Sequence, residues 1–341
     1  MSCLAADATA STTSDFPTLN DVRRTAERLA GRILETPVWR WQTGIVAQAL
    51  SPSTEVWLKL ELLQHTGTFK LRGALNCVAS LDAEALRRGV AAASAGNHAM
   101  AVAYAARAAG THARLAMPRH ASPMRIAACK ADGAEVHLTD TVHEAFALAQ
   151  RWVEEEGRTM IHPFDGPLTA QGTATIGLEL MRQVPELDAV VVPVGGGGLC
   201  GGIAAAVKQL KPQCLVFGIE PFGADAMHRS FRARETQKLE RVDTIADSLG
   251  APYTLPYSFG LCHRFVDDIV RVWDEELCRG MHHLYRDMKL VAEPAAAAAT
   301  AALLGPLRQR LDGKRVALIV CGSNIDAGRF AELVARGAVP G

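Results

Sequence analysis

Short apolar runs alternate with helix-like segments along most of the chain, and this alternation limits the folds that the sequence can form. Several runs lack the apolar–polar alternation of a half-exposed strand, so they predict strands buried on both faces, as in a parallel sheet covered by helices. A strand–helix–strand order predicts an α/β fold with right-handed crossovers. The expected strands are residues 56–62, 90–93, 113–117, 135–138, 159–162, 189–194, 215–219 and 316–320. The expected helices are residues 98–109, 142–156, 170–183, 199–210 and 275–288, with a further helix opened by Glu293-Pro294.

The composition narrows the class of protein further. The chain has 341 residues, of which 49% are apolar and 21% are charged, and its formal net charge is zero. That length fits one large or two modest domains, and the composition is unlike that of disordered, collagen-like or coiled-coil chains. A neutral chain is a poor match to a general nucleic-acid binder, which carries a basic excess. Because no run of 18 or more apolar residues is present, we expect no membrane-spanning segment.

The cysteines and the N-terminal residues bear on localisation. Eight cysteines are scattered without a C-x-x-C pair, so we expect no structural zinc site. The thiols are interpreted as reduced and mostly buried, as in a cytoplasmic protein. The first 16 residues are small and polar and lack the basic start and apolar middle of a signal peptide, so we interpret them as a frayed tail.

The strongest local motif is a strand that runs into four glycines and then into an apolar helix. Glycines let backbone N–H groups converge on an anion without obstruction by Cβ atoms, and the helix N-terminus adds a positive dipole end. The motif therefore predicts a phosphate site, with a merely tight strand–helix turn as the alternative. The glycines are Gly195, Gly196, Gly197 and Gly198, and Leu199 follows them.

Two nucleotide-binding motifs fit this turn less well. The spacing is not G-x-x-x-x-G-K-[ST] and no lysine follows, so ATP hydrolysis is not expected. A dinucleotide fingerprint belongs near the first strand of its unit, with an acidic residue about 20 residues further on. Glu220 follows the next strand at a comparable distance, so a nicotinamide-dependent dehydrogenase stays open as an alternative.

Three further motifs lie where expected strands end or helices begin. Lys70, beside Phe69, can be a partly desolvated amine suited to Schiff-base chemistry, with a solvated lysine as the alternative. Cys321 ends an expected strand, where a buried core cysteine is the alternative. A third segment of small and polar residues can present N–H groups to a carboxylate, or can be an ordinary helix cap. This segment consists of Ser94, Ala95, Gly96, Asn97 and His98.

Together these motifs are typical of one cofactor. In open α/β sheets, ligands bind where strands give way to turns and helices. A lysine that traps a carbonyl group, a cup for one phosphate and a loop for a carboxylate predict pyridoxal phosphate acting on an amino acid.

The motifs and their order resemble those of the fold-type II pyridoxal-phosphate enzymes, in particular the group of serine/threonine dehydratases (ammonia-lyases) and serine racemases. The resemblance runs from about Leu19 to Leu333, and residues 68–74 match the family's S-F-K-x-R-G-A. It implies that Lys70 forms the Schiff base and that Cys321 faces the pyridine nitrogen. The segment 94–98 would hold the substrate carboxylate, with Asn97 also near the phenolic oxygen of the cofactor. The implied cofactor-binding residues are Phe69, Lys70, Asn97, Gly195, Gly196, Gly197, Gly198, Leu199 and Cys321.

The resemblance also implies the fold and the assembly. The fold would be α/β and similar to that of the tryptophan synthase β chain, with two open, twisted parallel-sheet domains and the cofactor in the cleft between them. Residues 1–64 and 166–341 would form the large domain that binds pyridoxal phosphate. Residues 65–165 would form the small domain, with Lys70 near its boundary. Family members are commonly dimers or tetramers, so we expect a homodimer or homotetramer whose partner is a small amino-acid substrate.

Two departures from the family pattern narrow the prediction. Racemases of this group carry a serine that acts as acid and base opposite the lysine, whereas this chain has Ala95, which transfers no proton. The resemblance also implies a cation at Glu220 and Ala224, but the third ligand position is Ala226, which has no side-chain oxygen. We therefore expect either a monovalent cation held partly by backbone carbonyls or no cation.

These observations predict removal of water and ammonia from a 3-hydroxy-L-amino acid to give a 2-oxo acid, with Lys70 as the base. Threonine and serine are the default substrates, and a serine with a β-aryl group, such as phenylserine, or a β-carboxyl group stays open. An amino-acid racemase or β-replacement enzyme of the same group is the nearest alternative. A nicotinamide-dependent dehydrogenase and a non-catalytic binding protein on the same fold are more distant alternatives.

Overall fold

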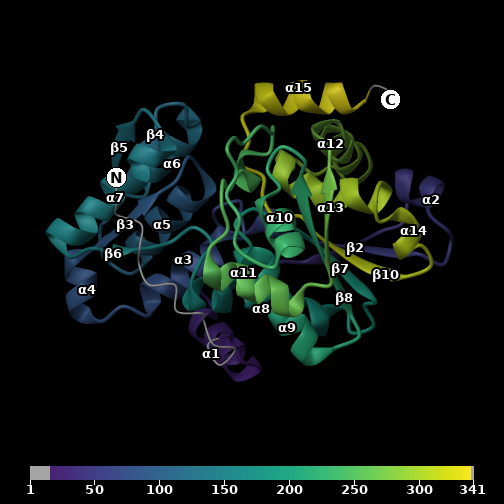
Figure 1. Cartoon of the computed structure of the whole chain (residues 1–341), viewed down its shortest axis with the longest axis horizontal. Coiled ribbons are helices and arrows are strands. Elements are labelled where there is room, and N and C mark those ends of the chain that lie inside the picture. The colour runs from purple at the N-terminus through teal and green to yellow at the C-terminus, as the bar shows by residue number, and fades with distance from the viewer. Residues whose placement is uncertain (1–15, 339–341) are drawn as a thin grey trace.

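The computed structural model describes residues 16–338 and arranges them around two β-sheets (Figure 1). One sheet has six strands in the order β1-β2-β10-β7-β8-β9, and the other has four strands in the order β5-β4-β3-β6. Apart from Phe16, the expected frayed tail lies outside the described residues. The strands are β1 (Val38–Trp41), β2 (Glu55–Lys59), β3 (Val90–Ala93), β4 (Ala113–Pro118), β5 (Glu135–Thr139), β6 (Thr159–Met160), β7 (Ala189–Pro193), β8 (Leu215–Pro221), β9 (Asp268–Val272) and β10 (Arg315–Ile319).

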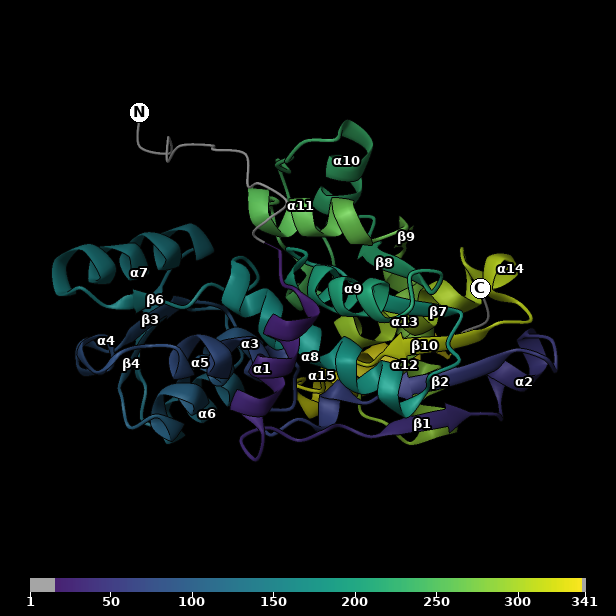
Figure 2. The ribbon, with the colours of Figure 1, turned by 90° about the horizontal axis from the view of Figure 1, so that it is seen from below.

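The helices connect and cover these strands (Figure 2). Short 3-10 turns, η2 (Glu61–Leu63) and η3 (Asp247–Leu249), follow β2 and precede the eleventh helix. The α-helices are α1 (Leu19–Leu29), α2 (Ile45–Ala49), α3 (Lys70–Ala79), α4 (Ala83–Arg88), α5 (Asn97–Ala108), α6 (Pro123–Ala131), α7 (Val142–Glu156), α8 (Pro167–Gln183), α9 (Gly198–Leu210), α10 (Ala226–Ala233), α11 (Pro256–Phe265), α12 (Asp274–Met288), α13 (Pro294–Leu304), α14 (Arg308–Leu311) and α15 (Ala327–Gly337).

The predicted α/β architecture is confirmed, and the strand ladders are parallel with one exception. In the six-stranded sheet, β2, β10, β7, β8 and β9 pair in parallel, and all pairs of the four-stranded sheet are parallel. The exception is β1, which pairs antiparallel with β2, placing Trp41 opposite Val56. Strand β1 lies at the edge of the sheet and immediately precedes β2 in the chain. The connection between them, residues 42–54, contains α2 and returns the chain in the opposite direction, so the two strands pair antiparallel without a crossover.

The large sheet is buried because helices pack on its central strands. Every residue of β7 is buried, so both faces of this strand are covered. Helices α9 and α13 both pack against β7 and β8. The alanine-rich sequence of α13 lets it lie close to the sheet, because small side chains permit a short helix–sheet distance, and ten of its eleven residues are buried.

The small sheet has its own cover and its own hydrophobic cluster. Helix α7 packs against β3 and β4. Helix α5 also packs against these strands, and every residue of β3 is buried. All four strands lie within the segment 65–165 that was assigned to the small domain. The domain boundaries themselves stay a prediction.

Parallel pairing sets where a ligand can bind. The carboxyl end of β3 leads into residues 94–96, that of β7 into the glycines that follow Pro193, and that of β10 into Cys321. Ligands in open α/β sheets bind at such carboxyl ends, so both sheets direct their loops to one region. Within residues 16–338, none of the helices combines the length and the apolar character that crossing a membrane requires.

Candidate active site

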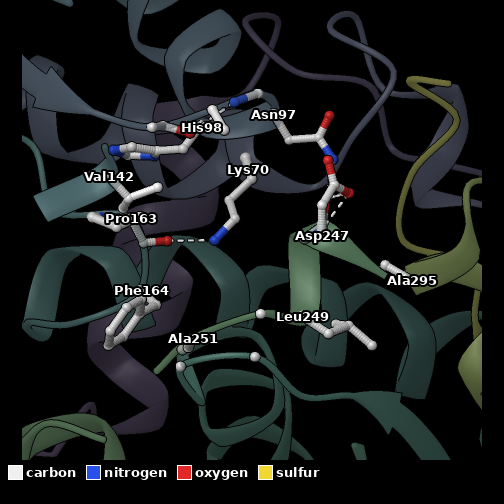
Figure 3. Close-up of a pocket in the computed structure, with 18 of the residues that line it drawn as sticks. Lys70, Asn97, His98, Val142, Pro163, Phe164, Asp247, Leu249, Ala251 and Ala295 are labelled. Atoms are coloured by element: carbon white, nitrogen blue, oxygen red, sulfur yellow. Dashed lines mark hydrogen bonds between the residues drawn. The ribbon is translucent and has the colours of Figure 1, made fainter. Parts of the chain in front are cut away.

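A pocket of about 390 Å³ lies where the loops of the two sheets meet (Figure 3). Its volume is within the range of cofactor and small-molecule sites, about 300–1,000 Å³. Every residue that was predicted to bind cofactor or substrate contributes to its lining, so residues far apart in the sequence meet there. These residues are Phe69, Lys70, Ser94, Ala95, Gly96, Asn97, His98, Gly195, Gly196, Gly197, Gly198, Leu199 and Cys321.

Lys70 is the first residue of α3, and its side chain projects into the pocket. Its Nζ donates a hydrogen bond of 2.5 Å to the carbonyl oxygen of Pro163 and lies 5.1 Å from the ring centroid of Phe69. Burial lowers the pKa of Lys70 to about 8, although the charges of Cys321 and Glu293 act in the opposite direction. The amine is therefore neutral in a much larger fraction of molecules than a solvated lysine would be.

Two histidines near Lys70 are held neutral. Burial, together with the charge of Lys70, lowers the pKa of His98 to about 3 and that of His162 to about 4. The Nε2 atom of His98 donates to the carbonyl oxygen of Ile161 at 2.7 Å, which fixes its tautomer. Neither imidazole adds positive charge to the pocket at neutral pH.

A buried ion-pair network holds the start of α3, two residues after Lys70. The Nε atom of Arg72 lies 2.8 Å from Glu61, and its Nη1 atom lies 2.6 Å from Glu179. Lys59 contacts the same Glu179 carboxylate at 2.6 Å. The side chains of Arg72 and Glu61 are fully buried, so each charge depends on its partners. The sequence motif contained Arg72, but its partners Glu61 and Glu179 come from η2 and α8.

The four glycines form the connection between β7 and α9, and each allows a close approach. A Cβ atom on Gly196 would lie 2.1 Å from the ring of Phe164, and one on Gly198 would lie 2.1 Å from the Phe164 carbonyl oxygen. Gly197 has φ of +95° and caps α9 as its N-cap residue. The first N–H groups of α9 have no partner within the helix and point toward the pocket end. An oxyanion such as a phosphate satisfies such groups.

The segment 94–98 leads from β3 into the N-terminus of α5. The N–H of Gly96 donates to the hydroxyl oxygen of Ser94 at 3.1 Å, which closes a small turn before the helix. A Cβ atom on Gly96 would lie 2.5 Å from Nη1 of Arg125, so only glycine fits between the turn and this side chain. Ala95 lines the pocket beside the free N–H groups of the α5 N-terminus. These groups can bind a carboxylate.

A polar cluster around Asn97 closes one side of the pocket, and the sequence analysis assigned only Asn97 among its members. Asn97 donates through Nδ2 to both carboxylate oxygens of Glu293, at 2.8 and 3.0 Å, and to Ser248 at 3.2 Å. Arg125 contacts Asp247 at 2.6 Å and the carbonyl oxygen of Asn324. The members come from distant segments, and Glu293 was noted in the sequence only as a helix start. A proline-opened helix carries no signal that its preceding acid accepts hydrogen bonds from a side chain that lines a pocket.

Buried acids and thiols in this region are shifted toward their neutral forms. Burial, reinforced by Asp247, raises the pKa of Glu293 to about 7 despite the nearby Arg125. Burial and the Glu293 charge raise the pKa of Cys321 well above its ordinary value. The Cys321 thiol is therefore protonated and neutral at physiological pH.

Glu220 and Ala224 lie outside the residues that line the pocket. The two carboxylate oxygens of Glu220 accept N–H groups from Met227 at 3.0 Å and His228 at 2.6 Å, at the N-terminus of α10. This use of Glu220 gives no support to a role in binding the ribose of a nicotinamide cofactor. Among residues 16–338, no cluster of three or more His, Cys, Asp or Glu side chains is suited to holding a metal ion. A cation held by Glu220 and backbone oxygens stays a prediction.

The remaining wall of the pocket is apolar and largely aromatic. Val142 and Phe146 of α7 line it, and so do Phe164 and Tyr253 from two later segments of the chain. His162 lies between the two groups, with ring centroids 6.3 Å from Phe146 and 4.6 Å from Phe164. Val142, Phe146 and Tyr253 belong to no recognisable motif, so the sequence analysis could not assign them.

The arrangement places three chemical functions around one cavity: an amine of lowered pKa, one helix N-terminus behind four glycines, and a second helix N-terminus behind a small turn. It can hold a phosphate and a carboxylate on either side of a lysine whose amine is suited to Schiff-base chemistry.

Comparison with known proteins agrees with this geometry. A phenylserine dehydratase of Ralstonia pickettii is 47% identical over 95% of this chain and 98% of its own. An L-threonine ammonia-lyase of Thermotoga maritima is 40% identical over 84% of this chain and 71% of its own. The solved structure of maize serine racemase superposes with a TM-score of 0.87 and 33% identity, over 93% of this chain and 97% of the racemase chain. The family described as pyridoxal-phosphate dependent enzyme matches residues 30–322, from the end of the first helix to the turn after Cys321, and the chain belongs to this family.

Proposed function

We propose that this protein eliminates water from a 3-hydroxy-L-amino acid. Hydrolysis of the unsaturated product then consumes one water molecule and gives a 2-oxo acid and ammonia. The observation that carries the proposal is the position of Lys70, whose amine of lowered pKa lies in one pocket with the α9 and α5 N-termini. The relatives support the reaction class, since one is a phenylserine dehydratase and another an L-threonine ammonia-lyase.

The residues of the pocket fit pyridoxal phosphate. Gly195–Gly198 and the α9 N-terminus would bind its phosphate, because glycine N–H groups and the helix dipole both favour an oxyanion there. Lys70 would bind its aldehyde carbon as a Schiff base. When bound, the cofactor supplies an electron sink for the charge left on the substrate α-carbon.

Lys70 would also serve as the base that takes the α-proton once the substrate amine has replaced it on the cofactor. The carbonyl oxygen of Pro163 holds Nζ within 2.5 Å and so fixes where the amine waits. With a pKa of about 8, the amine is close to the matching range for general-base catalysis near neutral pH. The α5 N-terminus would hold the substrate carboxylate and thereby orient the α-proton toward Lys70.

Cys321 would favour elimination over side reactions. Its thiol has a raised pKa and stays neutral, so it is a weak proton donor to the pyridine nitrogen that it would face. The charge on the α-carbon is then stabilised only moderately, and prompt loss of the 3-hydroxyl group is favoured. A carboxylate partner would hold the pyridine nitrogen protonated and extend the lifetime of that charge.

Racemisation is the alternative within the same family, and Ala95 opposes it. A racemase needs a proton donor on the side of the substrate opposite the lysine, and the methyl group of Ala95 supplies none. His98 is also unsuited, because its Nε2 proton is donated to Ile161 and its pKa is lowered to about 3.

The test is a substrate panel assayed by release of 2-oxo acid from the holoenzyme. The panel contains L-serine, L-threonine, L-threo-3-phenylserine and L-threo-3-hydroxyaspartate, and chiral chromatography follows the residual substrate. We expect 2-oxo acid and ammonia in equal amounts from at least one member. Formation of D-amino acid without 2-oxo acid would contradict the proposed dehydratase activity and show that the protein is a racemase.

We further propose a cytoplasmic homodimer or homotetramer with a monovalent cation at Glu220, or no cation. The seven cysteines within residues 16–338 are all free, which supports a reducing compartment. Light scattering after size-exclusion chromatography measures the number of subunits. The cation is tested by comparing the activity in a potassium buffer with that in a buffer whose only cation is a bulky organic one.

A further inference from the structure

One wall of the pocket is used by none of the groups assigned so far. Val142 and Phe146 lie one helical turn apart at the start of α7, so their side chains share a face. Both line the pocket, and Val142 remains 42% exposed. Val142 therefore lies where solvent still reaches the lining of the cavity, and both side chains offer apolar atoms to a ligand inside it.

This wall continues across the pocket as a series of rings. The ring centroids of Phe146 and His162 are 6.3 Å apart, those of His162 and Phe164 are 4.6 Å apart, and those of Phe164 and Tyr253 are 6.3 Å apart. The series joins α7 to the loop that follows η3. These spacings lie in the range of about 4.5–7 Å in which aromatic pairs attract each other.

The wall lies away from the polar side of the pocket. Figure 3 shows Val142, Pro163 and Phe164 on one side of Lys70, and Asn97 and Asp247 on the other. The position of the substrate follows from the proposed function, on which this inference rests. If the α5 N-terminus holds the carboxylate and Lys70 reacts at the α-carbon, the substituent on the β-carbon is directed to the wall that remains.

The charges around this wall do not favour an anionic substituent. Arg125 also lines the pocket, but Asp247 and the carbonyl oxygen of Asn324 already occupy its guanidinium group. Lys238 and His143 line the pocket with exposed side chains, which keep their hydration in water. A β-carboxylate would therefore exchange water for apolar neighbours, which is unfavourable.

We propose that Val142, Phe146 and Tyr253 form a subsite for an aryl group on the substrate β-carbon, so that the substrates are 3-aryl-3-hydroxy-L-amino acids. A methyl group, as in threonine, offers one carbon atom to this wall. A phenyl ring offers six, and it extends the series of rings from Phe146 to Tyr253. The subsite therefore selects the aryl substrate through contacts that the smaller substrates cannot make.

The first experiment measures kcat/KM for the holoenzyme and its variants. In the unmodified enzyme, kcat/KM for L-threo-3-phenylserine should exceed that for L-threonine by about tenfold or more. Phe146→Ala should lower kcat/KM for phenylserine about tenfold, mainly through a higher KM, and should change that for threonine by less than about threefold. Tyr253→Ala, in the loop that follows η3, should act in the same direction. Phe146→Leu should restore part of the loss.

Leu148→Ala is the matched control for Phe146→Ala. Both side chains belong to α7 and pack on the same hydrophobic cluster, but Leu148 does not line the pocket. The control should leave the ratio of the two substrates unchanged. If Phe146→Ala and Leu148→Ala both lower kcat/KM for the two substrates by equal factors, the role of Phe146 is structural and the subsite is refuted. Faster turnover of threonine or of 3-hydroxyaspartate than of phenylserine also overturns the proposal.

A second experiment separates the subsite from the reaction. L-phenylalanine and L-alanine lack the 3-hydroxyl group and cannot lose water, so their binding to the holoenzyme is measured by titration of the cofactor absorbance. L-phenylalanine should bind with a Kd about tenfold lower, and Phe146→Ala should remove the difference. Equal affinities refute the subsite. Tight binding of L-phenylalanine without release of any 2-oxo acid from the substrate panel supports the subsite and refutes the proposed dehydratase.

Discussion

The backbone N–H of Phe69 donates a hydrogen bond of 3.2 Å to the carbonyl oxygen of Cys321. Next to it, Thr68 and Gly322 form an isolated antiparallel bridge. The residue before Lys70 is thus attached to the end of β10, a central strand of the six-stranded sheet. Lys70 is therefore positioned by backbone contacts, and the frame around it does not depend on its own side chain.

Lys70→Ala should abolish elimination while leaving the fold intact. The same amine is the proposed covalent anchor and the proposed base, so kcat should fall on the order of 10³-fold or more. Release of 2-oxo acid measures the activity, absorbance measures the covalently bound cofactor, and circular dichroism serves as the control for folding. If the variant kept a tenth of the activity of the unmodified enzyme, Lys70 could not be the catalytic base.

Gly197→Asp should sharply weaken binding of pyridoxal phosphate. Gly197 has φ of +95°, and a Cβ atom there would lie 2.4 Å from Cε of Met227, so any side chain strains the turn. An aspartate also brings a negative charge to the proposed phosphate site. Titration of apoenzyme with the cofactor should show at least about a tenfold rise in Kd, which corresponds to about 1.4 kcal/mol. An unchanged Kd would mean that the phosphate binds elsewhere.

The rate at which apoenzyme captures the cofactor should depend on the ionisation of Lys70. Its pKa is lowered to about 8, so the neutral, nucleophilic amine accumulates as the pH rises toward that value. At pH 8 about half of the Lys70 amines are neutral, against roughly 0.3% of ordinary lysines. The capture rate should therefore rise steeply between pH 6 and 8 and level off near pH 9. A rate that still increases about sevenfold between pH 9 and 10 would show an unshifted lysine.

Turnover should consume the L-enantiomer without forming the D-enantiomer. Ala95 lines the pocket where a racemase of this group carries a hydroxyl group, and a methyl group cannot return a proton to the opposite side of the α-carbon. The measurement is chiral chromatography of residual substrate during turnover in deuterated water. D-enantiomer carrying α-deuterium, in amounts comparable to 2-oxo acid, would contradict the expectation.

Arg72→Ala should destabilise the protein strongly. Its fully buried guanidinium group pairs with Glu61 and Glu179, and its removal leaves buried carboxylates without a partner. Loss of one member of a buried pair costs about 3–5 kcal/mol of the free energy of unfolding. Arg119→Ala is the control, because its pair with Asp140 is exposed and should contribute less than about 1 kcal/mol. Denaturant unfolding of both variants with bound cofactor compares them, and equal losses would contradict the role of the network.

The sequence predicted the buried strands and the motifs at their ends better than it predicted the edge strands of the large sheet. Strands such as β7 and β3 have unbroken apolar runs, because helices cover both of their faces. The two edge strands of the large sheet, β1 and β9, were not predicted. Each contains an arginine and has exposed or half-buried residues, so neither has the continuous apolar run of a central strand.

The same distinction applies to the pocket. Lys70 and the glycines could be recognised because each belongs to a contiguous motif with a local conformational requirement. Glu293, Arg125 and Phe146 could not, because their contribution comes from the folding together of distant segments. A lone acid before a proline, or a phenylalanine within an amphipathic helix, has the same local pattern whether or not it faces a ligand.

The order of strands in the large sheet has a consequence for synthesis on the ribosome. Strand β10 lies between β2 and β7, yet it is the last strand of the described chain to be made. Until it emerges, β1 and β2 remain separated from β7, β8 and β9, and the edge of each group is unpaired. The four-stranded sheet is complete by Met160 and can form earlier. The large sheet therefore closes late, and the hydrogen bond between Cys321 and Phe69 forms at the same stage. A nascent chain that stalls before β10 cannot yet present Lys70 to the cofactor.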